Sequence, residues 1–349
     1  MTTVRVALIS ILVSLASAGI AQNHTKFQAS LISPIGTNGT KSLNYSNDYS
    51  FNLLMGMNGG VNKMEIGGLA NYNNKKVGGF QLAGVANITE DKSNGVVISG
   101  ICNLLTDDVQ AFQLSGVSNI NSKNSGGTMI SGVANITKEN AKGFQLAVAN
   151  LTMNKLDGVQ VGTFNYAKIL KGNQLGVFNV VDSLENGTPF GLFSIVKGGY
   201  YALEISTNDV IHANLNYKMG IEHFYTIFSV GYTEYKGNDV LKYGVGFGSL
   251  FSLGKKHKLA VEASSNHLVY NDDWHELNLL NTLKTNFQFY LTPKFSLVAG
   301  PSFHTYITDK KVGDKYGTIN TKNIIYDHES SKNKLFVWIG FNAGVSFTF

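Results

Sequence analysis

The sequence predicts an all-β fold: a transmembrane antiparallel β-barrel of about 16 to 20 strands that includes a meander of 16-residue repeats. Three observations predict it. The first half of the chain repeats with a fixed period, the second half alternates apolar and polar residues, and the last strand ends on an aromatic residue. The alternative is a β-solenoid repeat domain followed by a barrel of about eight to ten strands.

The repeat is clearest where the segment FQLAGVAN at 80–87 returns as FQLSGVSN at 112–119. Asparagines mark each unit, first every sixteen residues and then every fifteen or fourteen: Asn71, Asn87, Asn103, Asn119, Asn135, Asn150, Asn165 and Asn179. A fixed period means that one small unit stacks on its neighbours, because a single unit cannot bury an apolar face alone. We therefore expect a repeat region at 62–199 whose function belongs to the whole array.

Strand direction separates the two architectures. In a meander each unit is one strand, with Phe80 and Leu82 facing lipid and Gln81 and Asn87 facing inward. In a solenoid each unit is one coil and the asparagines stack, but the walls then need apolar residues that the polar half of the unit does not offer. The Gln-to-Asn separation also falls from six residues to five in later units, which fits either β-bulges or solenoid corners.

The N-terminal segment, residues 1–21, reads as a signal peptide that leaves 22–349 as the mature chain. Arg5 precedes the apolar stretch 6–20, and the residues at 16–18 or at 19–21 offer a cleavage site. The net charge of +5 is too small to indicate a nucleic-acid partner. A single cysteine, Cys102, excludes an internal disulfide.

Residues 200–349 read as non-repeat membrane strands. Ile211, Leu215 and Met219 share one strand face, while Asn214 and Lys218 share the other. Alternating stretches at 276–292 and 333–349 are longer than ordinary strands of ~5 to 6 residues and suffice for the ~9 to 11 that cross a bilayer. Tight turns at 220–223, 254–257 and 292–294 alternate with longer links, which we expect to face outside.

The C-terminus has a more specific pattern, in which Val345, Phe347 and Phe349 lie on one apolar face that ends the chain. It resembles the closing strand of bacterial outer-membrane β-barrels. That resemblance implies a Gram-negative outer-membrane location, with lipid and the barrel-assembly machinery as partners and these three residues as the assembly signal. The repeats resemble uncharacterised bacterial surface-repeat proteins with G-x-Q-x-x-G-x-x-N units, a family that implies no activity.

Catalytic motifs are not evident: the sequence has no nucleophile motif, P-loop or dinucleotide fingerprint, so we expect neither an enzyme nor a cofactor. One constellation of oxygen and nitrogen donors could bind a divalent cation at the loop rim. It comprises Asp272, Asp273, His275, Glu276, Asp327, His328 and Glu329. Solvated loop charges are the simpler interpretation of the same residues.

Two functions follow from these patterns. The leading hypothesis is an outer-membrane barrel that acts as a passive, porin-like pore or as a surface protein, without catalysis. The alternative is a surface adhesin or an assembly or interaction subunit, built from the repeats and anchored by a smaller barrel. Channel conductance and the direction of the repeat strands discriminate between them.

Overall fold

The computed structural model describes residues 23–349 except 236, 272, 313–314 and 317–323. The predicted signal peptide, residues 1–21, therefore lies outside the described residues. Apart from one short 3-10 helix the elements in this part of the chain are strands, and none of its helices is long and apolar enough to cross a membrane. The chain forms two compact units, Met1–Gly158 and Val159–Phe349.

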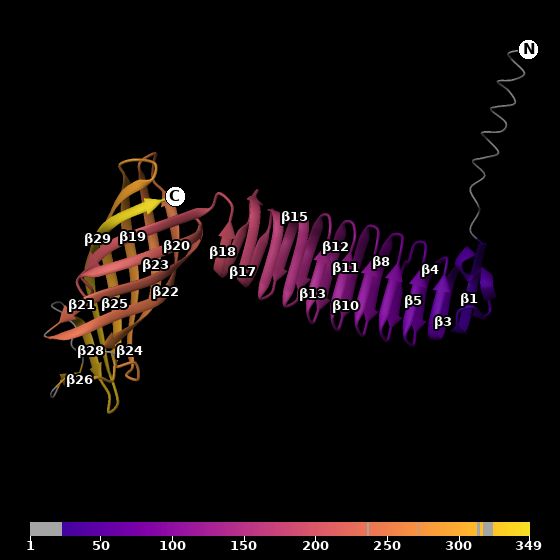
Figure 1. Ribbon diagram of the computed structural model, residues 1–349, viewed down its shortest axis with the longest axis horizontal. Coiled ribbons are helices and arrows are strands. Elements are labelled where there is room, and N and C mark those ends of the chain that lie inside the picture. The colour runs from indigo at the N-terminus through magenta and orange to yellow at the C-terminus, as the bar shows by residue number, and fades with distance from the viewer. Residues whose placement is uncertain (1–22, 236, 272, 313–314, 317–323) are drawn as a thin grey trace, which may run out of the picture. The chain divides into compact units, whose positions relative to one another are not determined.

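The first unit is a stack of coils, and strand β15 runs from it into the second unit (Figure 1). Its elements are β1 (Asn23–Ile32), β2 (Ile35–Gly36), η1 (Gly39–Asn44), β3 (Tyr45–Asn58), β4 (Gly60–Gly67), β5 (Ala70–Asn73), β6 (Phe80–Ala83), β7 (Ala86–Thr89), β8 (Ser93–Ser99), β9 (Cys102–Leu105), β10 (Val109–Ser115), β11 (Ser118–Asn121), β12 (Ser125–Ser131), β13 (Ala134–Thr137), β14 (Ala141–Leu146) and β15 (Ala149–Val161).

Each repeat supplies two short strands, and each strand pairs in parallel with its equivalent one repeat later. Strand β6 pairs with β8, β8 with β10 and β10 with β12, while β7 pairs with β9, β9 with β11 and β11 with β13. One repeat is thus one turn of a solenoid. The parallel coils also begin before residue 62, because β1 and β3 already pair in parallel.

The all-β fold is confirmed, in the form of the solenoid alternative, and the meander of repeats is wrong. Asn87 is the direct register partner of Asn103, whereas a meander would place them at opposite ends of neighbouring strands. The expectation that a solenoid needs apolar residues on both walls was wrong, because polar side chains can fill its interior. Its interior contains many asparagine, glutamine, serine and threonine side chains beside a smaller apolar cluster of Val97, Leu105, Val109 and Ala111, and many other apolar side chains are exposed.

The second unit begins with three more parallel strands and continues into a barrel. The parallel strands are β16 (Phe164–Leu170), β17 (Asn173–Leu184) and β18 (Thr188–Val196). The later elements are β19 (Tyr200–Asn208), β20 (Ala213–Ile221), β21 (Phe224–Tyr235), β22 (Asn238–Ser252), β23 (His257–Tyr270), β24 (Asn278–Tyr290), β25 (Phe295–Thr308), β26 (Lys311–Val312), β27 (Lys315–Tyr316), β28 (Ile324–Glu329) and β29 (Lys334–Thr348).

The barrel closes through antiparallel pairing of its first strand, β19, with its last, β29. Strand β28 pairs only with β29, so of the nine strands in this sheet eight close the barrel. The predicted count of about 16 to 20 strands is wrong, because the repeats form a separate solenoid and contribute no barrel strand. The tight turns are where they were predicted, between β20 and β21, β22 and β23, and β24 and β25.

Candidate functional site

The outer face of the barrel is a belt of apolar side chains that alternate with buried polar ones. Exposed members from several strands are Leu203, Leu215, Val230, Phe247, Leu283, Phe303 and Phe341. Buried, inward-facing members include Asn216, Glu262, Asn286 and Gln288. Apolar outside and polar inside is the pattern of a transmembrane barrel, because lipid surrounds the strands while the lumen does not contact it.

The middle of the lumen is occupied by a buried charge cluster. Lys218 Nζ donates to Glu204 Oε2 and to Glu262 Oε1, each at 2.5 Å, and Tyr225 Oη donates to Glu262 Oε1 at 2.8 Å. Lys218 and Glu204 are fully buried. Two carboxylates and a phenol around one ammonium satisfy the polar groups that burial would otherwise leave unpaired.

Each end of the lumen is filled by an apolar cluster. Near the rim of longer loops, Ile211, Leu268, Tyr270, Tyr306 and Trp338 pack together and are at most 1% exposed. Near the rim of tight turns, the cluster consists of Tyr200, Ala202, Tyr225, Ile227, Leu250 and Ala260. With the charge cluster between them, side chains occupy the described lumen at both ends and in the middle. A small barrel filled by its own side chains needs no solvent channel.

One histidine in the lumen has neighbours that resemble a catalytic arrangement. His304 Nε2 lies 2.8 Å from Ser302 Oγ and 3.4 Å from Asp209 Oδ1, and Nδ1 lies 3.0 Å from Thr282 Oγ1. A nucleophilic triad needs the acid and the hydroxyl on different ring nitrogens and a hydroxyl that substrate can reach. Ser302 shares Nε2 with Asp209, and the hydroxyl on the other nitrogen belongs to Thr282, which is buried at 6% exposure. His304 is also fully buried and stacks on Trp338 at 4.9 Å, so the arrangement supports the lumen packing.

Inside the solenoid, the repeat asparagines form a continuous hydrogen-bonded ladder. Asn71, Asn87, Asn103, Asn119 and Asn135 each donate through Nδ2 to Oδ1 of the next asparagine at 2.8–3.0 Å. Each also donates to a backbone carbonyl of the next coil, as Asn87 does to Ile98 O at 2.7 Å. The ladder therefore satisfies buried amides and joins consecutive coils.

Among the described residues of the solenoid, one buried carboxylate interrupts this amide interior. Glu65, fully buried, accepts hydrogen bonds from Asn58 at 2.6 Å, Asn73 at 2.7 Å, Gln81 at 2.9 Å and Asn52 at 3.2 Å. Burial raises the pKa of Glu65 to about 7, although these amides favour its ionised form. Glu65 pairs in register with Gln81, so it occupies the position that the next coil gives to a neutral amide.

The two turns of each coil lie at opposite ends of its strands and differ in chemistry. One turn is polar, with Glu90, Asp91 and Lys92 in one coil and Lys138 and Glu139 in another; we call this side the charged edge. The other turn carries an aliphatic residue that follows a glycine, except that Val148 follows Ala147. The aliphatic edge consists of Leu69, Val85, Ile101, Val117, Val133 and Val148, of which all but the half-buried Val85 are 42–53% exposed.

Glycine is required at the aliphatic edge because the coils meet there through their backbones. A Cβ added to Gly100 would lie 2.0 Å from Gly84 O, and one added to Gly116 would lie 2.1 Å from Gly100 O. The same turns carry hydrogen bonds between coils, including Val117 N to Ile101 O at 2.9 Å and Val133 N to Val117 O at 3.0 Å. The polar backbone groups of this edge thus bond to neighbouring coils.

Six of the seven residues predicted to bind a cation lie in two segments, 273–276 and 327–329. The seventh, Asp272, is outside the described residues. Glu276 pairs with Lys310 at 2.5 Å, and Asp327 and Glu329 pair with Lys334 at 2.9 and 3.3 Å. In the neighbouring turn, His275 N donates to Asp273 Oδ1 at 3.1 Å.

Within the described ranges, no three histidine, cysteine or acidic side chains gather closely enough to hold a metal ion. The structure therefore pairs three of the predicted carboxylates with lysines. His328 lies exposed on β28 beside Asp327 and Glu329. Cation binding by the seven residues stays a prediction.

The predicted assembly signal lies on β29 and at the residue that follows it. Phe347 and Phe349 are 47% and 58% exposed, and Val345 alternates with the buried Ser346. The ring of Phe349 stacks against Tyr201 and Tyr217, with centroid distances of 6.4 Å. These side chains point outward at the tight-turn rim, where they are accessible from outside the barrel.

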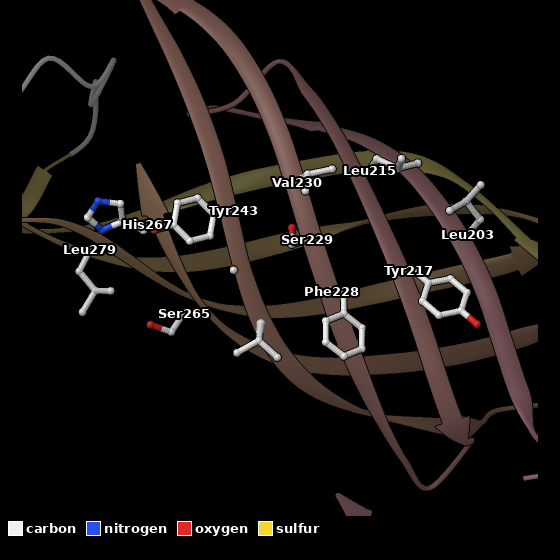
Figure 2. Close-up of a pocket in the computed structure, with 12 residues that line it drawn as sticks. Leu203, Leu215, Tyr217, Phe228, Ser229, Val230, Tyr243, Ser265, His267 and Leu279 are labelled. Carbon is white, nitrogen blue, oxygen red and sulfur yellow. The ribbon is translucent and has the colours of Figure 1, made fainter. Parts of the chain in front are cut away.

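A groove of about 640 Å³ crosses the outer face of the barrel over β19 to β24. Figure 2 shows Leu203, Leu215, Tyr217, Phe228, Val230, Tyr243, His267 and Leu279 along it. It forms where small residues such as Gly244 and Ser265 lie between larger ones. The side chains that line it belong to the apolar outer belt of the barrel, so the groove is part of that outer surface and not of the lumen.

The sequence alone did not reveal the filled lumen, the buried Glu65 carboxylate or the aliphatic edge. A signal existed for two of them. Glu65 breaks the series of neutral residues at its repeat position, and a glycine followed by an aliphatic residue recurs at 84–85, 100–101, 116–117 and 132–133. The apolar ends of the lumen gave no signal, because inward aromatic residues follow the same alternation as outward ones.

Comparisons with known proteins give structural likeness alone. No protein-family model matches the sequence, and the comparison with curated proteins gives no match. A de novo designed transmembrane β-barrel aligns with a TM-score of 0.26 and 7% identity, over 43% of this chain and 93% of that one. The outer-membrane protein Ail of Yersinia pestis aligns with a TM-score of 0.25 and 13% identity, over 43% of this chain and 99% of that one.

Proposed function

We propose that this chain is an outer-membrane protein in which a filled eight-stranded barrel anchors the repeat solenoid at the periplasmic face, as an interaction module without catalysis. One observation carries the proposal. The chain enters the barrel at Tyr200 and leaves it at Phe349, both at the rim of the tight turns, since Tyr200 pairs with Gly220 and Ala202 pairs with Thr348. In outer-membrane barrels short turns are periplasmic and longer loops are extracellular.

This topology favours the periplasm over the cell surface for the solenoid. The connector 197–199 is all that separates β18 from β19, so the repeats begin immediately outside the tight-turn rim. Display at the surface would require the barrel to insert with its long connector, 309–333, on the periplasmic side. A surface adhesin is therefore the second candidate, and a passive pore is disfavoured by the packed lumen.

Single cysteines and a membrane-impermeant maleimide test the topology in intact cells. In a Cys102→Ala background, Ser331→Cys in the loop region should react in intact cells. Lys138→Cys on the charged edge should react only after the outer membrane is permeabilised. Labelling of Lys138→Cys in intact cells would contradict the proposal and support the surface adhesin.

Planar-bilayer recording tests the anchor role. Protein purified in detergent and inserted into a bilayer should give no steady open-channel conductance, because Trp338, Lys218 and Tyr225 lie in the lumen at successive depths. Removal of the lumen charge by Lys218→Ala is the comparison variant. A large, steady conductance from the unaltered protein would restore the pore hypothesis.

A further inference from the structure

The aliphatic edge of the solenoid has no covering partner within the described residues, although its apolar side chains extend over consecutive coils. Leu69, Ile101, Val117, Val133 and Val148 are each 42–53% exposed. At a coil spacing of ~4.8 Å, this edge is on the order of 20 Å long or more. Phe112, Leu114, Phe144 and Leu146, which are 36–40% exposed on the adjoining strand face, widen it. A continuous apolar surface of this kind marks an interaction site.

We propose that the aliphatic edge lies in the lipid of the membrane that holds the barrel, as an interfacial membrane contact. Lipid hydrocarbon cannot form hydrogen bonds with backbone N–H and C=O groups, so such groups must already be paired within the protein where it contacts lipid. Here the turns bond to the adjacent coils, as Val117 N does to Ile101 O and Val133 N to Val117 O, and the repeat asparagines bond along their ladder. The edge therefore offers hydrocarbon to its surroundings, while these backbone and asparagine groups are paired.

The distribution of charge fits the same occupant. The charged edge lies at the opposite end of each coil, where Lys123 pairs with Asp107 at 2.8 Å on the surface. One end of every coil is thus suited to water and the other to hydrocarbon, as in an amphipathic element that lies in a membrane interface. A protein partner is less well matched, because the edge lacks the tryptophan, tyrosine and arginine residues that anchor protein interfaces.

The barrel keeps a bilayer within reach of this edge. The last solenoid strand, β18, precedes β19 by residues 197–199 alone, and it also contacts the barrel where Thr226 Oγ1 donates to Gly191 O at 2.8 Å. The effective concentration of the solenoid at the membrane surface is therefore high. Weak apolar contacts, one per coil, then suffice for binding. The inference rests on the proposed function only in requiring that the barrel spans a bilayer.

Lipid contact is measured on the full chain, reconstituted into vesicles of phosphatidylethanolamine and phosphatidylglycerol. In a Cys102→Ala background, an environment-sensitive NBD label is placed at Val117→Cys or Val133→Cys on the aliphatic edge, and at Lys138→Cys on the charged edge of the same coil as Val133. The edge labels should show blue-shifted emission and several-fold stronger quenching by nitroxide-bearing lipids than the label at position 138. Equal quenching at positions 133 and 138 overturns the inference.

A label at Leu283→Cys on the lipid face of β24 reports separately on barrel insertion. Quenching at 283 without quenching at 117 and 133 overturns the lipid contact and leaves the barrel anchor standing. Quenching at 117 and 133 alone supports the lipid contact and contradicts the anchor, while quenching nowhere contradicts both. Blue-shifted emission that depends on the protein-to-lipid ratio and not on nitroxide lipids identifies a second copy of the chain as the occupant, and it also overturns the inference.

The matched pair Val133→Glu and Lys138→Glu tests the contact without a label on the edge. Each places a carboxylate on an exposed position, so each should retain the β-sheet circular dichroism of the unaltered protein. Val133→Glu should weaken the quenching of a label at Val117→Cys several-fold, and Lys138→Glu should leave it unchanged. Equal quenching in the two variants contradicts a hydrocarbon environment at the edge.

Discussion

At the residue scale, Glu65 is a buried position at which stability depends on pH. Its folded pKa is about 7, above the ordinary value of 4.5, because the fully buried carboxylate is desolvated. Between these two values the folded state binds more protons than the unfolded state, so stability falls as pH rises. The contribution is fully present below about pH 4.5 and is lost above about pH 7. The difference is roughly 3 kcal/mol.

We predict that Glu65→Gln removes this pH dependence and stabilises the N-terminal coils at pH 8. The new amide finds acceptors if Asn73 or Gln81 rotates, because Asn73 Oδ1 and Gln81 Oε1 have no hydrogen-bond partner among the described residues. Amide hydrogen exchange around β4 at pH 5 and pH 8 measures the effect. The exposed Glu90→Gln is the control, and a pH slope that persists in Glu65→Gln would contradict the assignment.

Gly116 tests how tightly the coils stack. We predict that Gly116→Ala destabilises the solenoid by about 2 kcal/mol or more, because the new Cβ would lie 2.1 Å from Gly100 O. Val117→Ala, one residue away and pointing outward, should cost about 0.5 to 1 kcal/mol. Urea unfolding followed by circular dichroism compares the two variants. Equal midpoints would mean that the backbones are not in contact at this edge.

At the scale of the element, β24 shows what alternation predicts and what it does not. The sequence correctly places Leu283 outside and Thr282 inside, since Leu283 is 47% exposed and Thr282 is 6% exposed. It does not reveal that the inside is full. Thr282 Oγ1 lies 3.0 Å from His304 Nδ1, so an arginine at position 282 would meet packed side chains and not an open lumen.

We predict that Leu283→Arg impairs the barrel by ~2 to 4 kcal/mol, because position 283 is near the middle of β24 and faces hydrocarbon. Leu283→Phe keeps the face apolar and should be nearly neutral. The proportion of heat-modifiable protein after refolding into vesicles measures both. An equal yield from the two variants would mean that this face of β24 does not contact lipid.

The last strand, β29, carries a second prediction at this scale. Deletion of Phe349 should reduce the amount of barrel in the membrane and leave export intact, because an exposed terminal aromatic residue is the expected recognition point. Fractionation of cells followed by immunoblotting measures the membrane-inserted fraction. Phe341→Leu, which changes an outward aromatic residue within the strand, is the control. Normal insertion without Phe349 would remove this role.

For the repeats, the sequence determined the period but not the direction of pairing. A sixteen-residue period fits one strand with its turn or one coil of two short strands, and inside–outside alternation is the same in both. Gln81 and Asn87 are buried as predicted, yet Val85 is half-buried, because it follows a corner rather than continuing a strand. What decides between the two architectures is which residues of neighbouring repeats pair with each other, and a single sequence does not contain this information.

At the scale of the whole molecule, the barrel and the solenoid share one pattern: many polar side chains are buried and many large apolar side chains are exposed, although apolar clusters also fill the ends of the barrel lumen. The sequence predicted this for the barrel from its alternation and its terminal phenylalanine. Cation binding by the predicted metal residues stays a prediction, but the sequence did not reveal that Lys310 and Lys334 pair with three of the carboxylates. Such pairings depend on which loops share a rim.

The asparagine ladder makes the length of the solenoid an adjustable quantity. Each coil meets only its two neighbours, through identical amide and backbone bonds sixteen residues apart. Duplicating residues 103–118 should therefore extend the array by one layer, ~4.8 Å, without disturbing the bonds already present. Gene duplication could change the reach of the module in whole steps while the barrel stays the same, so relatives of this protein should differ in coil number more readily than in barrel strands.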